Sequence, residues 1–322
     1  MATKPARKTK KAATEPKRTT AQVFDLLFKQ LLHLSNKAVI SLINGLFGTN
    51  YPPNTKIEYL NTEAVTKKNR RRTSDIMLRI KGTIYHLEAQ INFDADMMIR
   101  VFEYGYDAAV LKKTYEGKVR TLEFPQARVI YLETDAKTPE GQILRLKFPG
   151  KPCYDYEVVN FNLLKCDVHE LEKRGFAILL PFYVLKLRPQ VKKAKNSEER
   201  KALSKPLKSL VSDLMGAVDR CKAKGKIDEV DVPPLIAGLE RLYRELFSQH
   251  KELAEGDIML QEKLDTYWSE KLDYYGDKFR VENSIKVAKK LLADGMSAAK
   301  VAKYTELPLK TIKVLQSKQK VA

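Results

Sequence analysis

Apolar residues near the beginning of the chain recur at the spacing of a helix. The positions that form this apolar face are Phe24, Leu27, Phe28, Leu31 and Leu32. Intervals of three and four residues place them on one side of a helix that begins near residue 20. Ser35 is of a preferred N-cap type and Gly48 of a preferred stop type, so a second helix is predicted up to Phe47. We expect both helices to cover a sheet.

Segments rich in β-branched and aromatic residues then predict that sheet. The expected strands are 55–62, 74–80, 83–90, 127–133, 154–163 and 176–187. Pro181 interrupts the last segment, so that strand is expected to be bent or to lie near an edge. A helix is predicted from Asp94, and its polar side carries Arg100, Glu103, Tyr104 and Asp107. The predicted class is therefore α/β (α+β), a mixed sheet flanked by helices.

After residue 200 the chain becomes mainly helical. Helical periodicity runs through 203–222, 233–250 and 259–275. Short helices are then expected at 284–294, 298–304 and 309–316, an order that resembles a helix-turn-helix. Glu306 stands where the turn of such a motif often has glycine, and a small helical cap or a dimer contact explains the segment equally well.

These changes of character divide the chain into regions. The first residues are rich in Lys and Arg and contain no apolar run, which predicts a disordered arm able to contact phosphates. The regions are a basic arm (1–19), an α/β domain (20–190), a linker (191–205), a helical region (206–280) and a small helical segment (281–322).

Two short strands joined by Lys81–Gly82 form the most informative segment. A two-residue turn pairs Ile80 with Thr83, and counting outward brings Asp75 opposite Glu88. Carboxylates at directly opposed positions repel each other unless a cation lies between them. The hairpin therefore indicates a cation site.

Strand alternation turns Gln90 and His86 to the same side as Glu88. The apolar positions that suit the opposite, buried face are Ile76, Leu78, Ile80, Tyr85, Leu87 and Ala89. A simpler interpretation stays open, in which acids at strand ends face solvent and have no function. His86 is either a partly buried polar residue or a further ligand.

The hairpin and the helix that follows it resemble the core of the PD-(D/E)XK nucleases. The stretches that carry this resemblance are Ile57–Glu63, Ser74–Asp75, Tyr85–Gln90 and Asp96–Tyr106. They look most like the PD-(D/E)XK nuclease family transposases, or recombination-promoting nucleases, over residues 20–190. The resemblance implies a restriction-endonuclease-like core and a metal-dependent DNA endonuclease.

The same resemblance implies the roles of individual residues. Asp75 and Glu88 take the metal-ligand places, Gln90 takes the third catalytic place where Lys is usual, and Glu63 is the candidate for an added acid. Mg²⁺ or Mn²⁺, held by hard carboxylate oxygens, would polarise a phosphodiester and lower the pKa of a bound water. An amide takes up no proton near neutral pH, so Gln90 would orient this water.

The charge of the chain agrees with a polyanionic substrate, since Lys and Arg total 59 against 40 Asp and Glu, a formal net charge of +19. The loop before Asp75 supplies candidate phosphate contacts, namely Lys67, Lys68, Arg70, Arg71 and Arg72. Arg100 is a further candidate, although a contact with Glu103 or Tyr104 within its own helix is equally expected. The expected partner is DNA.

Several classes of protein are excluded by what the sequence lacks. The three Cys and four His are scattered, without the spacing of a disulfide framework or zinc site. There is no nucleotide-binding glycine loop and no serine-hydrolase motif. Neither a signal peptide nor an apolar stretch of membrane-spanning length is found, so a cytoplasmic protein without a membrane partner is expected.

Three functions from different classes remain open. The first is the metal-dependent endonuclease. The second is a nucleic-acid-binding protein with a nuclease-like fold that no longer cuts. The third is a regulatory or assembly protein whose helical half is its working surface. A homodimer is compatible with each of them.

Overall fold

The protein is represented by a computed structural model that describes residues 20–60, 76–133 and 138–266, together with 288, 292, 296–305, 307, 309, 312, 315 and 316. The chain divides into two compact units, Met1–Leu260 and Gln261–Ala322. Among the sequence predictions, the basic arm, Glu63, the loop 67–72 and Asp75 lie outside the described residues.

The described part of the first unit contains a mixed sheet of six strands in the order β1-β2-β3-β6-β8-β7. Its strands are β1 (Glu58–Leu60), β2 (Ile76–Ile80), β3 (Thr83–Gln90), β6 (Gln126–Tyr131), β7 (Gly141–Leu146) and β8 (Tyr154–Asn162). β1, β2 and β3 are antiparallel, β3, β6 and β8 are parallel, and β7 is antiparallel to β8. The predicted α/β class with a mixed sheet is confirmed.

The β2–β3 hairpin has the predicted register. Ile80 is opposite Thr83, and the described pairing ends with Ile76 opposite Leu87. The turn residues Lys81 and Gly82 both have positive φ, 47° and 91°, the combination that defines a type I′ turn. This turn matches the right-handed twist of the strands, and it fixes which side chains share a face.

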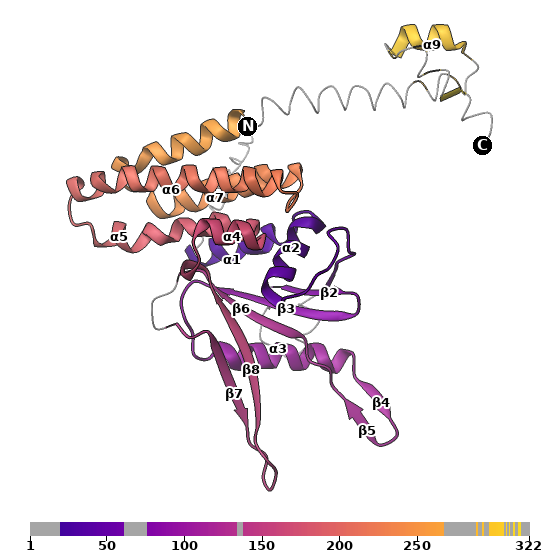
Figure 1. Cartoon of the computed structure of the whole chain (residues 1–322), viewed down its shortest axis with the longest axis vertical. Coiled ribbons are helices and arrows are strands. Elements are labelled where there is room, and N and C mark those ends of the chain that lie inside the picture. Colours follow the sequence, from indigo (N-terminus) through magenta and orange to yellow (C-terminus); the bar gives the residue numbers. More distant parts are fainter. Residues whose placement is uncertain are drawn as a thin grey trace, which may run out of the picture. The chain divides into compact units, whose positions relative to one another are not determined.

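Helices cover both faces of the sheet (Figure 1). Helix α3 (Met97–Leu111) connects the parallel strands β3 and β6, and its Tyr104 packs with Met77 and Ile84 on one face. Helices α1 (Thr20–Leu31) and α2 (Asn36–Phe47) cover the other face, where Phe47 contacts the ring of Tyr85 at 4.7 Å between centroids. Two faces of the hairpin were distinguished in the sequence, one apolar and one polar. Both are therefore buried.

The predicted ends of α2 are confirmed in detail. The Ser35 hydroxyl accepts a hydrogen bond from the backbone N–H of Ala38, and Gly48 has a φ of 68° at the C-terminal cap. The apolar positions that predicted α1 are buried, and α2 buries Val39, Ile40 and Ile43. Helix α3 begins at Met97, three residues later than expected, because Asp94 and Asp96 form the turn before it.

The segment predicted as a bent strand at 176–187 is instead a helix, and that prediction is wrong. Ala177–Leu187 forms the 3₁₀ helix η2, whose residues are buried on every side except at Lys186. A continuous apolar run carries no period, so a buried strand and a buried helix cannot be distinguished by pattern. Pro181 then stops the regular α-helical bonding without placing the segment at a sheet edge.

Helices of the second half enclose η2. They are α4 (Val168–Arg174), α5 (Arg188–Lys193), α6 (Ser197–Ala223) and α7 (Val232–Phe247). Because α6 and α7 both pack on η2, the compact unit continues to Leu260 and does not end at residue 190. The segment expected to be a linker, 191–205, contains the end of α5 and the first turns of α6.

The ends of the first unit are tied together across a long sequence separation. The Thr20 hydroxyl donates to Glu245 at 2.8 Å, and the Ser35 backbone N–H donates to the buried Asp231 at 2.8 Å. A third tie joins α4 to α6, where the buried Glu172 accepts from Arg220 at 2.7 Å and from Lys224 at 2.6 Å. The helices up to Leu260 are therefore an integral part of the sheet domain.

Some elements were not predicted from the sequence. The edge strand β7, helix α4 and a separate hairpin of β4 (Thr114–Glu116) and β5 (Val119–Thr121) were missed. The first strand is shorter than expected, beginning at Glu58 and not at residue 55. Predictions of helices at 203–222 and 233–250 are confirmed by α6 and α7, and residues 259–266 are helical as expected.

The second unit contains α9 (Ala298–Thr305), which agrees with the helix predicted at 298–304. Val301 packs with Ala288, Leu307 and Ile312 in a small core. The helix-turn-helix interpretation stays a prediction. No helix within the described residues is long and apolar enough to cross a membrane.

Candidate functional site

A buried carboxylate and a buried imidazole lie side by side on β3. His86 and Glu88 are two residues apart, so strand alternation turns both towards the face that α3 covers. The Nε2 atom of His86 lies 2.8 Å from Oε1 of Glu88, with exposed fractions of 0% and 5%. Glu88 is therefore not a solvent-facing acid at a strand end.

The surroundings of the imidazole indicate which nitrogen carries its proton. The Nδ1 atom of His86 is buried and has no hydrogen-bond partner among the described residues. An unpaired N–H in such a place costs more than an unpaired lone pair, so we assign the proton to Nε2, which donates to Glu88. The ring of Tyr104 contacts the imidazole edge-on at 5.8 Å between centroids and holds its orientation from α3.

Gln90 lies near the carboxyl end of β3, on the same sheet face as Glu88. It lines a hollow of about 630 Å³, which also receives Asp25 from α1 and Asp94 from the turn before α3. The carboxyl ends of parallel strands are where α/β sheets commonly bind ligands. The predicted third catalytic residue is thus at the surface of a concave site, with Glu88 buried next to it on the strand.

Arg100 forms an ion pair with an acid that precedes its helix. The carboxylate that pairs with its guanidinium belongs to Asp94, six residues earlier in the chain. Both side chains are partly exposed, at 35% and 41%, so the pair is open to solvent on the rim of the site. The interaction fixes the start of α3 relative to the end of β3.

A further polar network supports this rim. The amide of Gln142 donates to the backbone carbonyls of Asp94 and Ala95, and its oxygen accepts from the Tyr131 hydroxyl at 3.1 Å. Burial raises the pKa of Tyr131, which keeps this hydroxyl protonated and able to donate. This network could not be predicted from sequence patterns, because it joins β6, β7 and the turn before α3.

The structure brings together some of the predicted site residues. Glu88 and Gln90 share one face of β3, and Arg100 lies on the helix that covers this face. Outside the described residues lie Asp75, Glu63, Lys67, Lys68, Arg70, Arg71 and Arg72. Within the described residues, no group of three or more His, Cys, Asp or Glu could hold a metal ion.

His86 is the functional candidate that the sequence placed correctly without identifying its partner. Alternation put it on the face of Glu88, and a partly buried polar role was one of two interpretations. The structure buries it fully and bonds it to Glu88. The contact depends on the cover that α3 provides, which a strand pattern does not show.

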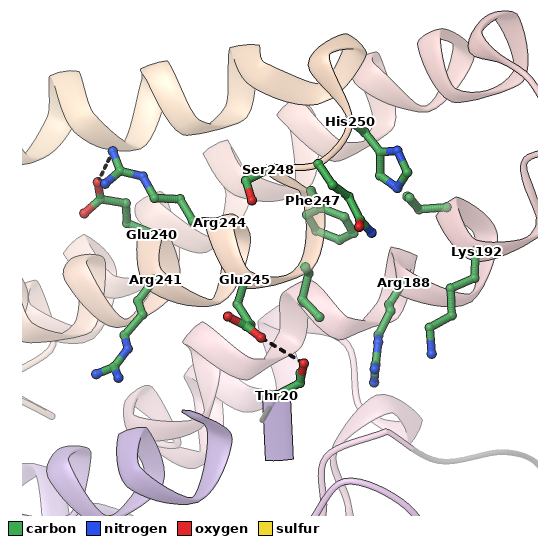
Figure 2. A pocket seen from close by; sticks show the side chains of 13 residues that line it. Thr20, Arg188, Lys192, Glu240, Arg241, Arg244, Glu245, Phe247, Ser248 and His250 are labelled. Atoms are coloured by element: carbon green, nitrogen blue, oxygen red, sulfur yellow. Dashed lines mark hydrogen bonds and ion pairs between the residues drawn. The ribbon is translucent and has the colours of Figure 1, made fainter. Parts of the chain in front are cut away.

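A second and larger hollow, of about 940 Å³, is lined mainly by helix residues and by none from β3. Figure 2 shows the side chains that line it. The hollow is bounded by α5 and the end of α7, with Thr20 from α1 at its edge. Arg244 pairs with Glu240 at 2.7 Å, and Arg188 pairs with Glu133 at 2.5 Å, so much of its positive charge is balanced.

Comparisons with known proteins identify no relative of this chain, so a proposal of its function depends on the site. No protein-family model, no curated protein and no solved structure matches the chain.

Proposed function

We propose that the protein is a metal-dependent DNA endonuclease with a restriction-endonuclease-like core, of the recombination-promoting or transposase-associated kind. The observation that supports this most is the β2–β3 hairpin. Its type I′ turn and its described register are those from which Asp75 was expected opposite Glu88. Continued by one pair, that register would complete the proposed acid pair.

The donor set suits a hard divalent cation. Glu88 supplies a carboxylate and Gln90 an amide oxygen on the same face, and Asp75 and Glu63 would add further carboxylates. When bound, Mg²⁺ or Mn²⁺ would polarise the phosphoryl group and lower the pKa of a water molecule. Gln90 then orients that water, since its amide takes up no proton, and the His86 hydrogen bond holds the carboxylate of Glu88 in place.

DNA is the proposed substrate because the chain is strongly cationic, with a formal net charge of +19. Lys67, Lys68 and Arg70–Arg72, in the loop before Asp75, are proposed to contact phosphates. Arg100 contributes less, since Asp94 already balances its charge. A cytoplasmic location and action on DNA there are part of the same proposal.

A second candidate is a DNA-binding protein with a nuclease-like fold that does not cut. It is favoured by the described part of the site, where Glu88 is engaged with His86 and no three-ligand group is found. On this hypothesis Gln90 has no catalytic task and binding depends on the basic segments.

Plasmid cleavage separates these candidates. The purified full chain is incubated with supercoiled plasmid in Mg²⁺, Mn²⁺ or EDTA, beside Asp75→Ala and Glu88→Gln. Metal-dependent nicking that is lost in both variants supports the nuclease. Tight, salt-sensitive DNA binding without nicking under any metal overturns it and supports the second candidate. His33→Gln, outside the proposed site, serves as the matched control and should cut as the wild type does.

A further inference from the structure

The β4–β5 hairpin stands apart from the rest of the fold. It forms a two-stranded sheet of its own between α3 and β6, and it projects beyond the main sheet (Figure 1). Every residue of its two strands is exposed. Its base is tied to the body by Lys112, whose ammonium donates to the carbonyl of Gly82 at 3.3 Å.

One face of the hairpin carries an aromatic ring between two cations. Tyr115 is directly opposite Arg120, so both side chains lie on the same face. The Arg120 guanidinium is 5.3 Å and the Lys113 ammonium 6.0 Å from the centre of the Tyr115 ring. This face is defined here as the ribbon face.

Folding of the protein does not account for this face. An isolated two-stranded hairpin is at best marginally stable in water, and this one buries no residue of either strand. Tyr115 is 59% exposed and Val119 on the opposite face 61% exposed, so neither contributes to a core. An ordered but uncovered ribbon suits a surface that is covered by a partner.

The charge of the segment selects the kind of partner. Between residues 112 and 121 the acidic residue is Glu116, and the basic residues are Lys112, Lys113, Lys118 and Arg120. Lys and Arg gathered on one face are the electrostatic signature of a contact with nucleic-acid phosphates. A two-stranded ribbon also has the width that the major groove of B-DNA admits.

We propose that the ribbon face binds duplex DNA, with Lys113 and Arg120 on backbone phosphates and Tyr115 packed against the duplex between them. The inference rests on the proposed function in that DNA is the ligand. It adds a contact element after the end of α3, tied by Lys112 to Gly82 and so to the end of β3 opposite Gln90. The ribbon thereby lengthens the duplex that the protein can hold.

The test is equilibrium binding of a fluorescein-labelled duplex of about 30 base pairs by the full chain. All proteins carry Glu88→Gln and are measured in EDTA, so that cutting cannot affect the result. Lys113→Ala with Arg120→Ala should raise Kd about tenfold or more and should reduce the slope of log K against log salt by about 2. Tyr115→Ala should raise Kd and leave that slope unchanged.

The matched control is Lys201→Ala with Lys205→Ala, which removes the same charge from exposed positions of α6. Equal Kd and equal salt slope for the two double variants overturn the proposal, because only general charge would then matter. A ribbon variant that changes the mass measured by light scattering, with Kd unchanged, assigns the ribbon to self-association and also overturns it.

Failure of the nuclease and failure of the ribbon are distinguishable. Loss of binding in the ribbon variant supports the proposal even where the plasmid assay shows no cutting. If the full chain with an unmodified ribbon does not bind the duplex, the proposal is overturned, whatever the cutting assay shows. Thermal melts check the fold, and all variants should melt with the parent because their changed side chains are exposed.

Discussion

His86 and Glu88 form a buried pair on β3, with 2.8 Å between Nε2 of the imidazole and Oε1 of the carboxylate. A carboxylate that is only 5% exposed is costly unless it is hydrogen-bonded, and the imidazole supplies one such bond. In metal sites, hydrogen bonds of this kind orient a ligand. The buried imidazole therefore orients Glu88, which is a proposed ligand of the cation.

Replacing His86 should weaken the binding of Mn²⁺ without removing a ligand. His86→Leu takes away the donor to Glu88, and loss of such an outer partner commonly lowers metal affinity by about 10- to 100-fold. His86→Gln should restore most of the affinity, because its amide nitrogen can occupy the place of Nε2. Isothermal titration with Mn²⁺ measures both, and equal affinities for the two variants contradict the positioning role.

Gly45 in α2 should be intolerant of a methyl group. A Cβ at this position would lie 2.3 Å from the Phe176 ring and 2.9 Å from the carbonyl oxygen of Arg174. Overpacking against a backbone atom costs about 1–3 kcal/mol, so Gly45→Ala should lower the free energy of unfolding by about that amount in urea titrations.

Gly216 in α6 provides the matched control for this substitution. Its Cβ would meet only Nη1 of Arg220, at 3.0 Å, and not the Nε atom that donates to Glu172. The helix preference for Ala over Gly is about 1 kcal/mol, so Gly216→Ala should leave stability unchanged or slightly raised. A loss as large as that of Gly45→Ala would contradict the packing argument.

The buried Glu172 should make stability depend on pH. Burial alone would raise its pKa, but hydrogen bonds from Lys224 and Arg220 outweigh burial and hold the pKa below its ordinary value of 4.5. A lowered pKa in the folded state stabilises the fold above the unfolded value, and this contribution is lost as the pH falls through the folded pKa. Urea titrations at several pH values should show a steeper decline below about pH 4.5 than Glu172→Gln shows.

Removing both cations from Glu172 should cost more than removing the acid. Arg220→Ala with Lys224→Ala leaves a carboxylate that is 1% exposed without these partners, a loss of about 3 kcal/mol at neutral pH. Glu172→Gln leaves two cations that are each about half exposed and remain hydrated, so its cost should be smaller. The double variant should recover relative to wild type when the pH is low enough to protonate Glu172.

The hairpin turn should be sensitive to side chains that resist positive φ. Gly82 has a φ of 91° and Lys81 a φ of 47°. Gly82→Ala should lower the free energy of unfolding by about 1–2 kcal/mol, since a Cβ is strained in this region even though space is free. Lys81→Asn should instead keep or raise stability, because Asn tolerates the left-handed conformation. Thermal melts of both variants test the turn type.

Local patterns explain which parts of the fold the sequence predicts. Periodicity and caps placed α1 and α2, and turn chemistry placed β2 and β3 in register, because each depends on neighbouring residues. In contrast, η2 is apolar throughout, so its conformation is decided by the helices that surround it. The edge strand β7 is half exposed and alternates weakly, which hid it.

The candidate site was likewise predictable only where it depends on local strand geometry. Pairing across the hairpin selected Glu88, and alternation selected Gln90. The hydrogen bond between Glu88 and His86 was not predictable. It depends on α3, which packs over the strand and buries His86. Arg100 was assigned to phosphate or to its own helix, and the tertiary pair with Asp94 competes with both.

The contact between α1 and α7 also sets the order of events when the protein is made. Thr20 and Glu245 are 225 positions apart in sequence. At about 5–20 residues per second, the ribosome adds the partner of α1 about 10–45 s after α1 itself. Throughout that interval the part of the apolar side of α1 that α7 covers lacks its partner, while β3 and η2 become available to the rest before α7 is made. We therefore expect the nascent chain to depend on chaperones until translation has passed α7.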